Sequence, residues 1–515
     1  MSLAAAEKAK SEPQAPALID ARRTFTWAQL DETLNRAVNA MLAVDFGPER
    51  RIAVYARNSA ETVLAYLTSL HAGVSAAPVS SQLTVEEVVY ILTDSGADLL
   101  FTGPETLDIA IQAAEKAGGV RIIAWRSEPR AGVTAWEDWL AAAASDRPPP
   151  TDMRPLTYLQ YTSGTTGRPK AIDAVAATMP RTETVAGLFE ALRAPNAFNV
   201  TGPNLVVGPL YHNAPLSSVR QLAGGTPIVV MDRFDAEQAL RAIQEHRVAT
   251  SVMVPTHFQR LLALPPEVRA RYDVSSLQRV AHTGAACPVN VKAAMIEWFG
   301  PVLIEAYGGT ESGTTNMITS EEWLAHRGSV GRTMEQFELQ VIGENGERLG
   351  ANEVGQLYFR DKTGRGIIYK NDAEKTRAAH REPAVFTLGE MGYFDDDGYV
   401  YITDRVSDMI VSGGVNIYPA EIERVLLTHP DVLDAVVIGV PNKEMGEEVK
   451  ALVIAKDLAA PPTHEALVAH CRTHLAGYKC PRSIDFVSDV GRNAIGKVNK
   501  RSVRAPFWPT VRTIG

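Results

Sequence analysis

The chain has 515 residues, of which 45% are hydrophobic and 22% are charged, and its formal net charge at pH 7 is −9. This length exceeds what one hydrophobic core supports, so about two to four domains are expected. The acidic balance argues against a nucleic-acid partner, because phosphate binding requires clustered Lys and Arg.

The three cysteines are Cys287, Cys471 and Cys480, and none forms a C-x-x-C pair. Such a sparse, odd set predicts neither a disulfide framework nor a zinc site. Residues 1–16 lack the apolar core of a signal peptide, and no apolar run approaches the roughly 18 residues of a membrane-spanning helix. We therefore expect a cytoplasmic protein with reduced thiols and no transmembrane segment.

From about residue 25, short β-rich runs alternate with helical runs, which is typical of parallel sheets covered by helices. Strands are predicted at 51–55, 97–102, 120–124, 205–207, 226–231, 250–254 and 302–305, and helices at 60–71 and 236–246. Residues 146–155 contain four prolines and are typical of a linker.

Beyond residue 404 the pattern changes to a mixed order of helices and strands. The predicted elements are helices at 420–428 and 464–475 and strands at 434–439, 449–454 and 484–487. The predicted fold class is therefore α/β, with a large N-terminal domain of several helix-covered sheets and a small α+β C-terminal domain.

Residues 161–170 read YTSGTTGRPK and follow an apolar run. Glycines let a backbone bend around a ligand, and hydroxyls, backbone N–H groups and a lysine suit phosphate oxygens. The segment lacks the spacing of a Walker A loop. Taken alone, a flexible surface loop explains this composition equally well, so further motifs must decide.

These ten residues resemble the phosphate loop of the adenylate-forming superfamily, which contains acyl-CoA synthetases, peptide-synthetase adenylation domains and luciferases. The resemblance extends from about residue 20 to residue 504. It implies ATP binding by the loop residues Thr162, Ser163, Gly164, Thr165, Thr166 and Lys170.

Residues 305–311 read EAYGGTE and resemble the second motif of the superfamily. The resemblance implies that Thr310 binds the α-phosphate and Glu311 holds Mg²⁺, while Tyr307 stacks near adenine and Glu305 belongs to the nucleotide site. A carboxylate-held Mg²⁺ suits a triphosphate that loses pyrophosphate. An isolated glutamate at this position would more simply be a solvated loop residue.

Two shorter segments resemble parts of the same site. Residues 283–286 (TGAA) are similar to the turn against adenine and the acyl group, which implies contacts from Gly284 and Ala285. Residues 209–213 (PLYHN) are similar to the segment whose histidine, here His212, lies near the carboxylate. A partly buried packing histidine is the alternative for His212, and a structural role is expected for His282.

Residues 388–423 resemble the segment that joins the two domains. It implies that Arg405 assists ribose binding. The aspartate that usually binds ribose is replaced here by Glu390, which keeps the charge and adds a methylene. Residues 395–398 (DDDG) predict a hairpin turn, which explains them better than a calcium site.

The superfamily hinge falls on Ser407, where relatives carry Asp or Lys, and serine can absorb the required backbone rotation. The implied division is an N-terminal domain over 1–403, a hinge over 404–408 and a mobile C-terminal domain over 409–515. In the last of these, Gly413, Gly414 and Asn416 match the loop that lines the pantetheine tunnel.

Residues 491–501 (GRNAIGKVNKR) complete the match. By resemblance, Lys497 is the mobile lysine that bridges the carboxylate and the α-phosphate during adenylation. A compact charge on a long stem suits that task. An isolated lysine near this position would be interpreted as a solvated side chain.

The sequence therefore predicts an AMP-forming acyl-CoA ligase that uses ATP, Mg²⁺ and coenzyme A, with Lys497, His212, Thr310 and Glu311 as catalytic residues. Small apolar residues near the expected pocket favour a fatty or aromatic monocarboxylic acid. An enzyme that loads a carrier protein and a non-catalytic nucleotide-binding relative are the alternatives, and a homo-oligomer is left open.

Overall fold

The structure is a computed structural model that describes residues 4–146, 148, 154–156, 158–162, 170–173, 182–193, 200–370, 372–405, 408–412, 415–442, 445–493 and 496–508. For residues 162, 170, 173, 405 and 416 only the backbone is described. Predicted ligand contacts from Ser163, Gly164, Thr165, Thr166, Gly413 and Gly414, and the predicted pivot at Ser407, lie outside the described residues.

The first sheet is entirely parallel and is formed by short strands, of which all but the edge strand β7 (Val133–Ala135) are mostly buried. In spatial order its strands are β4 (Ser75–Val79), β3 (Arg51–Tyr55), β5 (Leu99–Thr102), β6 (Arg121–Ala124) and β7. Its helices are α3 (Ala60–His71), α4 (Val85–Ser95), α5 (Leu107–Lys116) and α6 (Trp136–Ala141). The alternation predicted from the sequence is confirmed here, and β3 and α3 have the predicted bounds.

The second sheet has more strands, and its pairing changes from parallel in one half to antiparallel in the other. Its parallel half runs β14 (Leu303–Gly309), β13 (Arg279–His282), β12 (Thr250–Met253), β10 (Asn204–Val206), β11 (Ile228–Val230) and β1 (Pro16–Ile19), with β2 (Thr24–Thr26) antiparallel at the edge. Its helices are α1 (Ala4–Ser11), α2 (Trp27–Leu42), α8 (Val185–Arg193), α9 (Asn213–Ala223), α10 (Ala236–His246), α11 (Pro255–Leu262), α12 (Pro266–Arg269) and α13 (Val289–Phe299).

The other half of this sheet is antiparallel, whereas the sequence pattern predicted parallel sheets covered by helices. It consists of β15 (Gly313–Thr319), β16 (Gly331–Thr333), β22 (Tyr399–Arg405), β21 (Glu390–Phe394), β18 (Gly355–Asp361), β20 (Val385–Phe386) and β19 (His380–Glu382), with β17 (Phe337–Ile342) paired to β18 and with α14 (Ser320–Ala325) and α15 (Ala373–Ala378) at its margins. The predicted hairpin at 395–398 joins β21 to β22, and the Asp395 N–H donates to the Tyr399 carbonyl at 2.9 Å.

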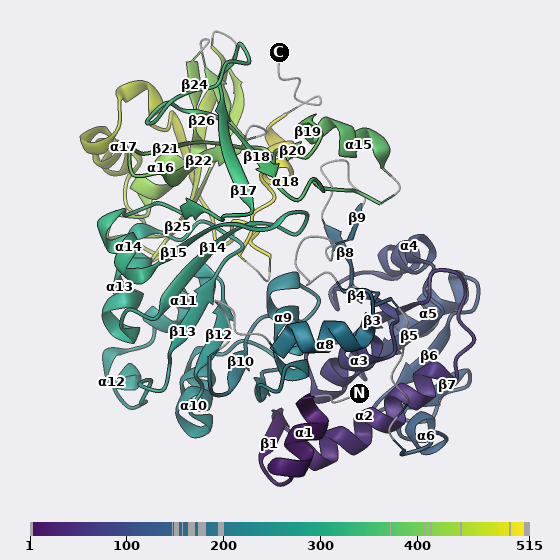
Figure 1. Ribbon diagram of the computed structural model, residues 1–515. Coiled ribbons are helices and arrows are strands. Elements are labelled where there is room, and N and C mark those ends of the chain that lie inside the picture. Colours follow the sequence, from purple (N-terminus) through teal and green to yellow (C-terminus); the bar gives the residue numbers. More distant parts are fainter. Residues whose placement is uncertain are drawn as a thin grey trace.

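The main core lies where the two parallel sheets face each other across α3 and α9 (Figure 1). Every residue of α3 is buried, because sheets and helices cover it on all sides. A helix that is apolar over most of its circumference is typical of such a central position, and the carboxylate of Glu61, the acidic residue of α3, pairs with Arg23 at 2.6 Å.

A third, smaller sheet follows β22 and has its own core. Its strands are β24 (Val415–Ile417), β23 (Ile410–Ser412), β26 (Gly446–Ala455) and β25 (Val432–Asn442), with β27 (Ser483–Phe486) parallel to β26. The helices α16 (Pro419–Leu426), α17 (His464–His474) and α18 (Lys500–Arg504) and the 3₁₀ turns η1 (Gly477–Lys479) and η2 (Ala505–Phe507) accompany it. The apolar side chains of α16, α17 and the strands form a separate cluster. This separate core explains why the sequence pattern of this part is typical of an independent domain.

Candidate active site

The predicted site residues lie mainly at one edge of the parallel strands. In parallel α/β sheets ligands bind beyond the carboxyl ends of the strands, where the connecting loops meet. His212 lies in the connection from β10 to α9, and Gly284 and Ala285 form the turn after β13. Tyr307 lies on β14, and Thr310 and Glu311 lie in the turn from β14 to β15.

The predicted phosphate loop joins two strands of a hairpin. Strand β8 (Leu159–Thr162) pairs antiparallel with β9 (Lys170–Asp173), so the backbones of Thr162 and Lys170 face each other. The Tyr161 hydroxyl donates to Asp94 Oδ2 on α4 at 2.8 Å. The strand ends therefore hold both ends of the loop, as a backbone cradle for phosphate requires.

Glu311 is oriented by a residue that the sequence motifs did not indicate. The Tyr369 hydroxyl donates to Glu311 Oε1 at 3.2 Å, and Tyr369 forms an antiparallel bridge with Ile172 on β9. Burial, followed by the charge of Glu311, raises the pKa of Tyr369, so the hydroxyl keeps its proton and remains a donor. Tyr369 thus links the phosphate-loop hairpin to the predicted metal ligand.

The residue that replaces the usual ribose aspartate is oriented by a tyrosine of the second motif. Glu390 Oε2 accepts a hydrogen bond from the Tyr307 hydroxyl at 3.0 Å. Glu390 also lies opposite Arg405 in the register of β21 and β22. The structure therefore brings the side chains of Tyr307 and Glu390 together and places the backbone of Arg405 opposite Glu390. The extra methylene of Glu390 is accommodated in a buried position.

Glu305 has a different environment from the one expected of a nucleotide ligand. Its Oε2 lies 2.6 Å from the Nζ of buried Lys292 on α13 and 3.6 Å from Nε2 of fully buried His282. Burial raises the pKa of Glu305, although the charge of Lys292 opposes this effect. This geometry indicates an internal ion pair beneath the site, so it does not support direct nucleotide contact. The sequence offered no signal for Lys292 as its partner.

Lys497 reaches the same edge from the C-terminal part of the chain. Burial, followed by the positive charge of Lys497, lowers the pKa of His212 to about 4. The neighbouring Gly496 packs against the first turn of α11, where an added Cβ would lie 2.7 Å from Thr256 Cγ2. Lys497 and His212, which are 285 positions apart in the sequence (497 − 212), therefore share one electrostatic environment.

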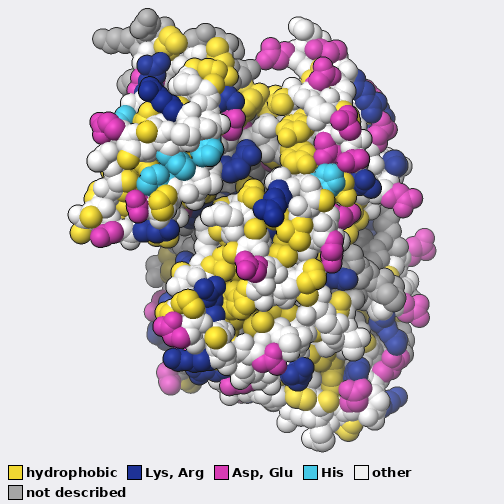
Figure 2. Space-filling view, turned by 90° about the vertical axis from the view of Figure 1, so that its left-hand side faces the viewer, with side chains coloured by type: hydrophobic (Ala, Val, Ile, Leu, Met, Phe, Trp, Pro, Cys, Tyr) yellow, Lys and Arg dark blue, Asp and Glu magenta, His cyan; other side chains and the backbone are white. Residues whose placement is uncertain are grey.

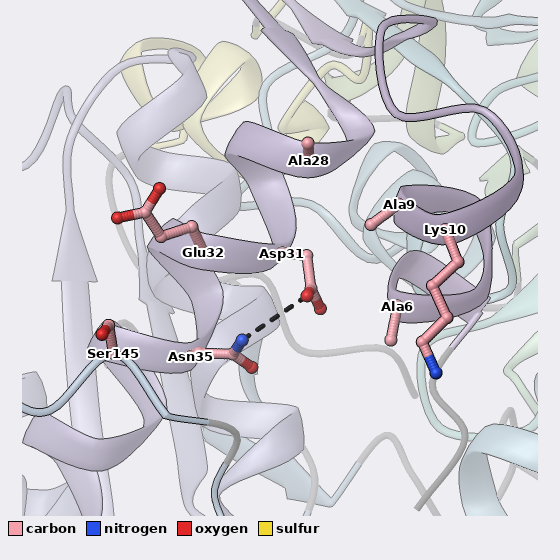
Figure 3. Close-up of a pocket in the computed structure, with 8 residues that line it drawn as sticks. All are labelled: Ala6, Ala9, Lys10, Ala28, Asp31, Glu32, Asn35 and Ser145. Carbon is pink, nitrogen blue, oxygen red and sulfur yellow. Dashed lines mark hydrogen bonds between the residues drawn. The ribbon is translucent and has the colours of Figure 1, made fainter.

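Two features of the surface lie apart from this edge. Three histidines, His429, His470 and His474, gather on the C-terminal domain with ring centroids 5.1 and 5.2 Å apart in successive pairs, and histidine side chains are visible on its lobe in Figure 2. A hollow of about 380 Å³ lies between α1 and α2, where Asn35 donates to Asp31 at 3.5 Å (Figure 3). Within the described ranges, no group of three or more His, Cys, Asp or Glu side chains is arranged to hold a metal ion.

Comparison with known proteins gives a family for the chain. Residues 5–366 match the family described as AMP-binding enzyme, and residues 421–497 match the AMP-binding enzyme C-terminal domain. The chain therefore belongs to the family of AMP-binding enzymes. In the part of the chain that the structure describes, helices long and apolar enough to cross a membrane are absent.

Three relatives illustrate the range of this family. A feruloyl-CoA synthase of Amycolatopsis sp is 32% identical over 97% of both chains. A fatty acid–[acyl-carrier-protein] ligase of Streptomyces coeruleorubidus is 30% identical over 97% of this chain and 95% of the relative. The o-succinylbenzoate CoA synthetase of Bacillus subtilis, solved with its acyl-adenylate, has a TM-score of 0.77 and 26% identity over 98% of each chain.

Proposed function

We propose that this chain, an AMP-forming acid–thiol ligase, joins a fatty or aromatic monocarboxylic acid to coenzyme A through an acyl-adenylate. The observation that carries the proposal is the packing of Gly496, the residue before Lys497, against Thr256 in the first turn of α11. In agreement with this geometry, the charge of Lys497 contributes to the lowered pKa of His212. A mobile cation beside the carboxylate and the α-phosphate is what the adenylation step requires, because negative charge develops there.

The proposed first half-reaction is attack of the acid carboxylate on the α-phosphorus of ATP, with departure of pyrophosphate. Lys497 would neutralise the charge that develops on the α-phosphate. The proposed second half-reaction is attack of the coenzyme A thiol on the acyl carbonyl, with departure of AMP. Most of the catalysis would then come from positioning and electrostatics.

The chain's own residues fit one magnesium ion of the kind that substrate phosphates help to bind. Glu311 supplies a carboxylate oriented by Tyr369, and Mg²⁺ is commonly held by one or two carboxylates together with phosphate oxygens. The ion would neutralise charge on the leaving pyrophosphate. Thr310, Glu390 and Arg405 are proposed to hold the α-phosphate and the ribose.

We also propose the division into 1–403, a hinge over 404–408 and a C-terminal domain over 409–515. The change of sheet between β22 and β23 supports it, since β22 belongs to the large sheet and β23 to the small one.

A cytoplasmic location is proposed as well, supported by three cysteines that are all free thiols. Light scattering decides whether the protein is a homo-oligomer.

The experiment is ATP–pyrophosphate exchange with octanoate, palmitate, benzoate and 3-phenylpropanoate, followed by detection of the thioester with and without coenzyme A. Exchange that depends on the acid, with acyl-CoA formed only when coenzyme A is added, is the expected result. Exchange without a coenzyme A product would favour a carrier-protein acceptor, which the Streptomyces relative makes the second candidate. Binding of ATP without exchange for any acid would contradict the proposal.

A further inference from the structure

Hydrogen bonds join the described residues on either side of residues 494 and 495, next to Lys497. Arg492 and Val498 form an antiparallel bridge. The Asn493 N–H donates to the Lys497 carbonyl at 2.9 Å, and the Lys497 N–H donates to Asn493 Oδ1 at 2.9 Å. The Gly496 N–H donates to the Asn493 carbonyl at 2.8 Å. These hydrogen bonds fix the backbone from which the Lys497 side chain extends.

On one side, Arg492 ties this segment to strand β25. Its Nε and Nη2 donate to the two carboxylate oxygens of Asp434 at 2.6 and 2.7 Å, and its Nη1 donates to the Gly496 carbonyl at 2.8 Å. A bidentate pair between Arg and a carboxylate fixes orientation as well as energy. The third bond places this guanidinium one residue from Lys497.

On the other side, Lys500 ties the start of α18 to α16. Its Nζ lies 2.8 Å from Glu423 Oε1, and the same oxygen accepts a hydrogen bond from the Val437 N–H on β25 at 2.7 Å. Asp404, on β22 of the large sheet, accepts from the Ala420 N–H at the start of α16 at 2.8 Å. A series of contacts therefore runs from the large sheet through α16 to Lys500, which lies three residues after Lys497 in the chain.

The charge of Lys500 is maintained in this buried setting. Burial lowers the pKa of Lys500, but the negative charges of Glu423, Asp404 and Asp408 outweigh this effect, and the net result is a raised pKa. Lys500 therefore remains an ammonium group throughout the neutral range. Its link to Lys497 is the chain itself, because Lys500 begins α18 only three residues after Lys497 (500 − 497).

We propose that Arg492 and Lys500 are positioning residues that hold Lys497 for adenylation. This inference rests on the proposed role of Lys497. A lysine on a free tail would lose rotational and backbone freedom each time it met the substrates, and prior anchoring removes much of that cost. Both anchors end on the C-terminal sheet and its helix, so Lys497 would act as part of a rigid body.

The test compares Arg492→Met, Arg492→Lys, Lys500→Met and Lys500→Arg in the full chain. The two half-reactions are measured separately: ATP–pyrophosphate exchange with the acid that gives the fastest wild-type exchange, and thioester formation from its prepared acyl-adenylate. We expect Arg492→Met to lower kcat of exchange by about 10- to 100-fold, in the range of a small displacement of a catalytic group. The KM values and thioester formation should stay within about twofold, because they do not need the anchored lysine.

The conservative variants sharpen this expectation. Arg492→Lys should recover little, because a lysine cannot make the paired contact with Asp434 while bonding the Gly496 carbonyl. Lys500→Arg should recover most of the rate, because a single ion pair with Glu423 tolerates either cation. The matched control is Lys450→Met, which removes another ion pair of the C-terminal domain, the 2.7 Å contact between Lys450 on β26 and Asp485 on β27.

Equal loss of both half-reactions in Arg492→Met, or a similar loss in Lys450→Met, would overturn the inference and indicate a purely structural role. Unchanged exchange would overturn it as well. If the wild-type protein activates no acid, the proposed function fails, and amide hydrogen exchange then tests the anchoring independently. The amides of residues 493, 496 and 497 should exchange at least about tenfold faster in Arg492→Met than in the wild type, and unchanged rates would contradict the proposal.

Discussion

Gly496 lies so close to Thr256 that an added Cβ would be only 2.7 Å from the Thr256 Cγ2 atom. Residue 496 precedes Lys497, whereas Thr256 belongs to the first turn of α11 in the large domain. The φ angle of Gly496 is also positive, at 75°. Contact between the domains at this point therefore depends on the absence of a side chain.

The first prediction follows from this contact. Gly496→Ala should lower the rate of ATP–pyrophosphate exchange by about tenfold or more, because the new methyl group displaces the neighbouring lysine. Thioester formation from acyl-adenylate should change little. Gly491→Ala is the matched control, since Gly491 has a φ of 72° but open space around its Cβ position.

A second substitution separates the clash from backbone strain. If the clash dominates, Thr256→Ala combined with Gly496→Ala should recover most of the lost exchange rate, because the methyl group then has room. Equal effects of Gly491→Ala and Gly496→Ala would show instead that only the left-handed backbone conformation matters.

The second prediction concerns the pH dependence of stability. Burial, followed by the charge of Lys497, lowers the pKa of His212 to about 4, whereas an ordinary histidine titrates near 6.5. Between these two values the unfolded chain binds a proton that the folded chain does not, so stability falls as the pH decreases from about 6.5 to about 4. His212→Gln should therefore weaken the pH dependence of Tm over this window.

The measurement is thermal unfolding at closely spaced pH values from 4 to 7. The variant should differ most from the wild type at the acidic end and least near pH 7, where His212 is neutral in both states. An identical pH profile for the two proteins would show that His212 is not buried beside a positive charge.

The third prediction concerns magnesium. Glu311→Gln should lower the rate of exchange by about 10²-fold or more, in the range seen when a preorganised charged group is removed, and should raise the Mg²⁺ concentration needed for half-maximal rate. Tyr369→Phe removes only the hydroxyl that orients Glu311, so its effect should be several times smaller but in the same direction.

Titration of Mg²⁺ into chelator-treated protein, followed by exchange assays, checks this order. A Tyr369→Phe variant with an unchanged Mg²⁺ requirement would show that the hydrogen bond does not orient the ligand. An unchanged requirement in Glu311→Gln would contradict the assignment of the carboxylate.

The fourth prediction concerns the buried pair of Lys292 and Glu305. Lys292→Met or Glu305→Gln leaves one partner without its counterion in a desolvated position, which should lower the free energy of unfolding by about 3–5 kcal/mol. The double variant should be more stable than the sum of the single effects predicts, because neither charge is then left buried alone.

Urea unfolding of the four proteins in this cycle measures the coupling between the two side chains. Additive effects would show that the 2.6 Å contact contributes little to stability. Exchange assays on the double variant add a separate result: retained ATP affinity would agree with the interpretation that Glu305 lies beneath the site and does not bind the nucleotide.

Much of the fold was accessible from the sequence because local patterns determine local elements. Strand β3 and helix α3 follow from a short apolar run and a longer one, and the turn at Asp395 follows from residues that favour its backbone angles. The pairing of β14 with β15 and the antiparallel half of the large sheet were not predicted. Strand order depends on contacts between distant segments, which a local pattern does not contain.

The residues of the candidate site also fall into two groups, those that a motif indicates and those that it does not. The residues of the phosphate loop, Glu311 and Lys497 were predicted from the sequence, because each stands in a motif with distinctive spacing. Tyr369 and Lys292 were missed because each belongs to an unremarkable segment, and each acquires its role only through the side chain beside it. Arg492 stood within the recognised motif, but nothing in the motif showed which carboxylate would face it.

The family, the chemistry and the identity of the charged groups could be inferred without coordinates, since these depend on which residues are present and how they are spaced. Which of those groups lie in contact depends on the tertiary fold: Glu390 with Tyr307, Arg492 with Asp434, and Glu305 with Lys292. The fold also brings the charge of Lys497 near enough to lower the pKa of His212. The reason is physical, because the energy of an ion pair or hydrogen bond depends on distance and burial, and both are set by how segments far apart in the chain pack together.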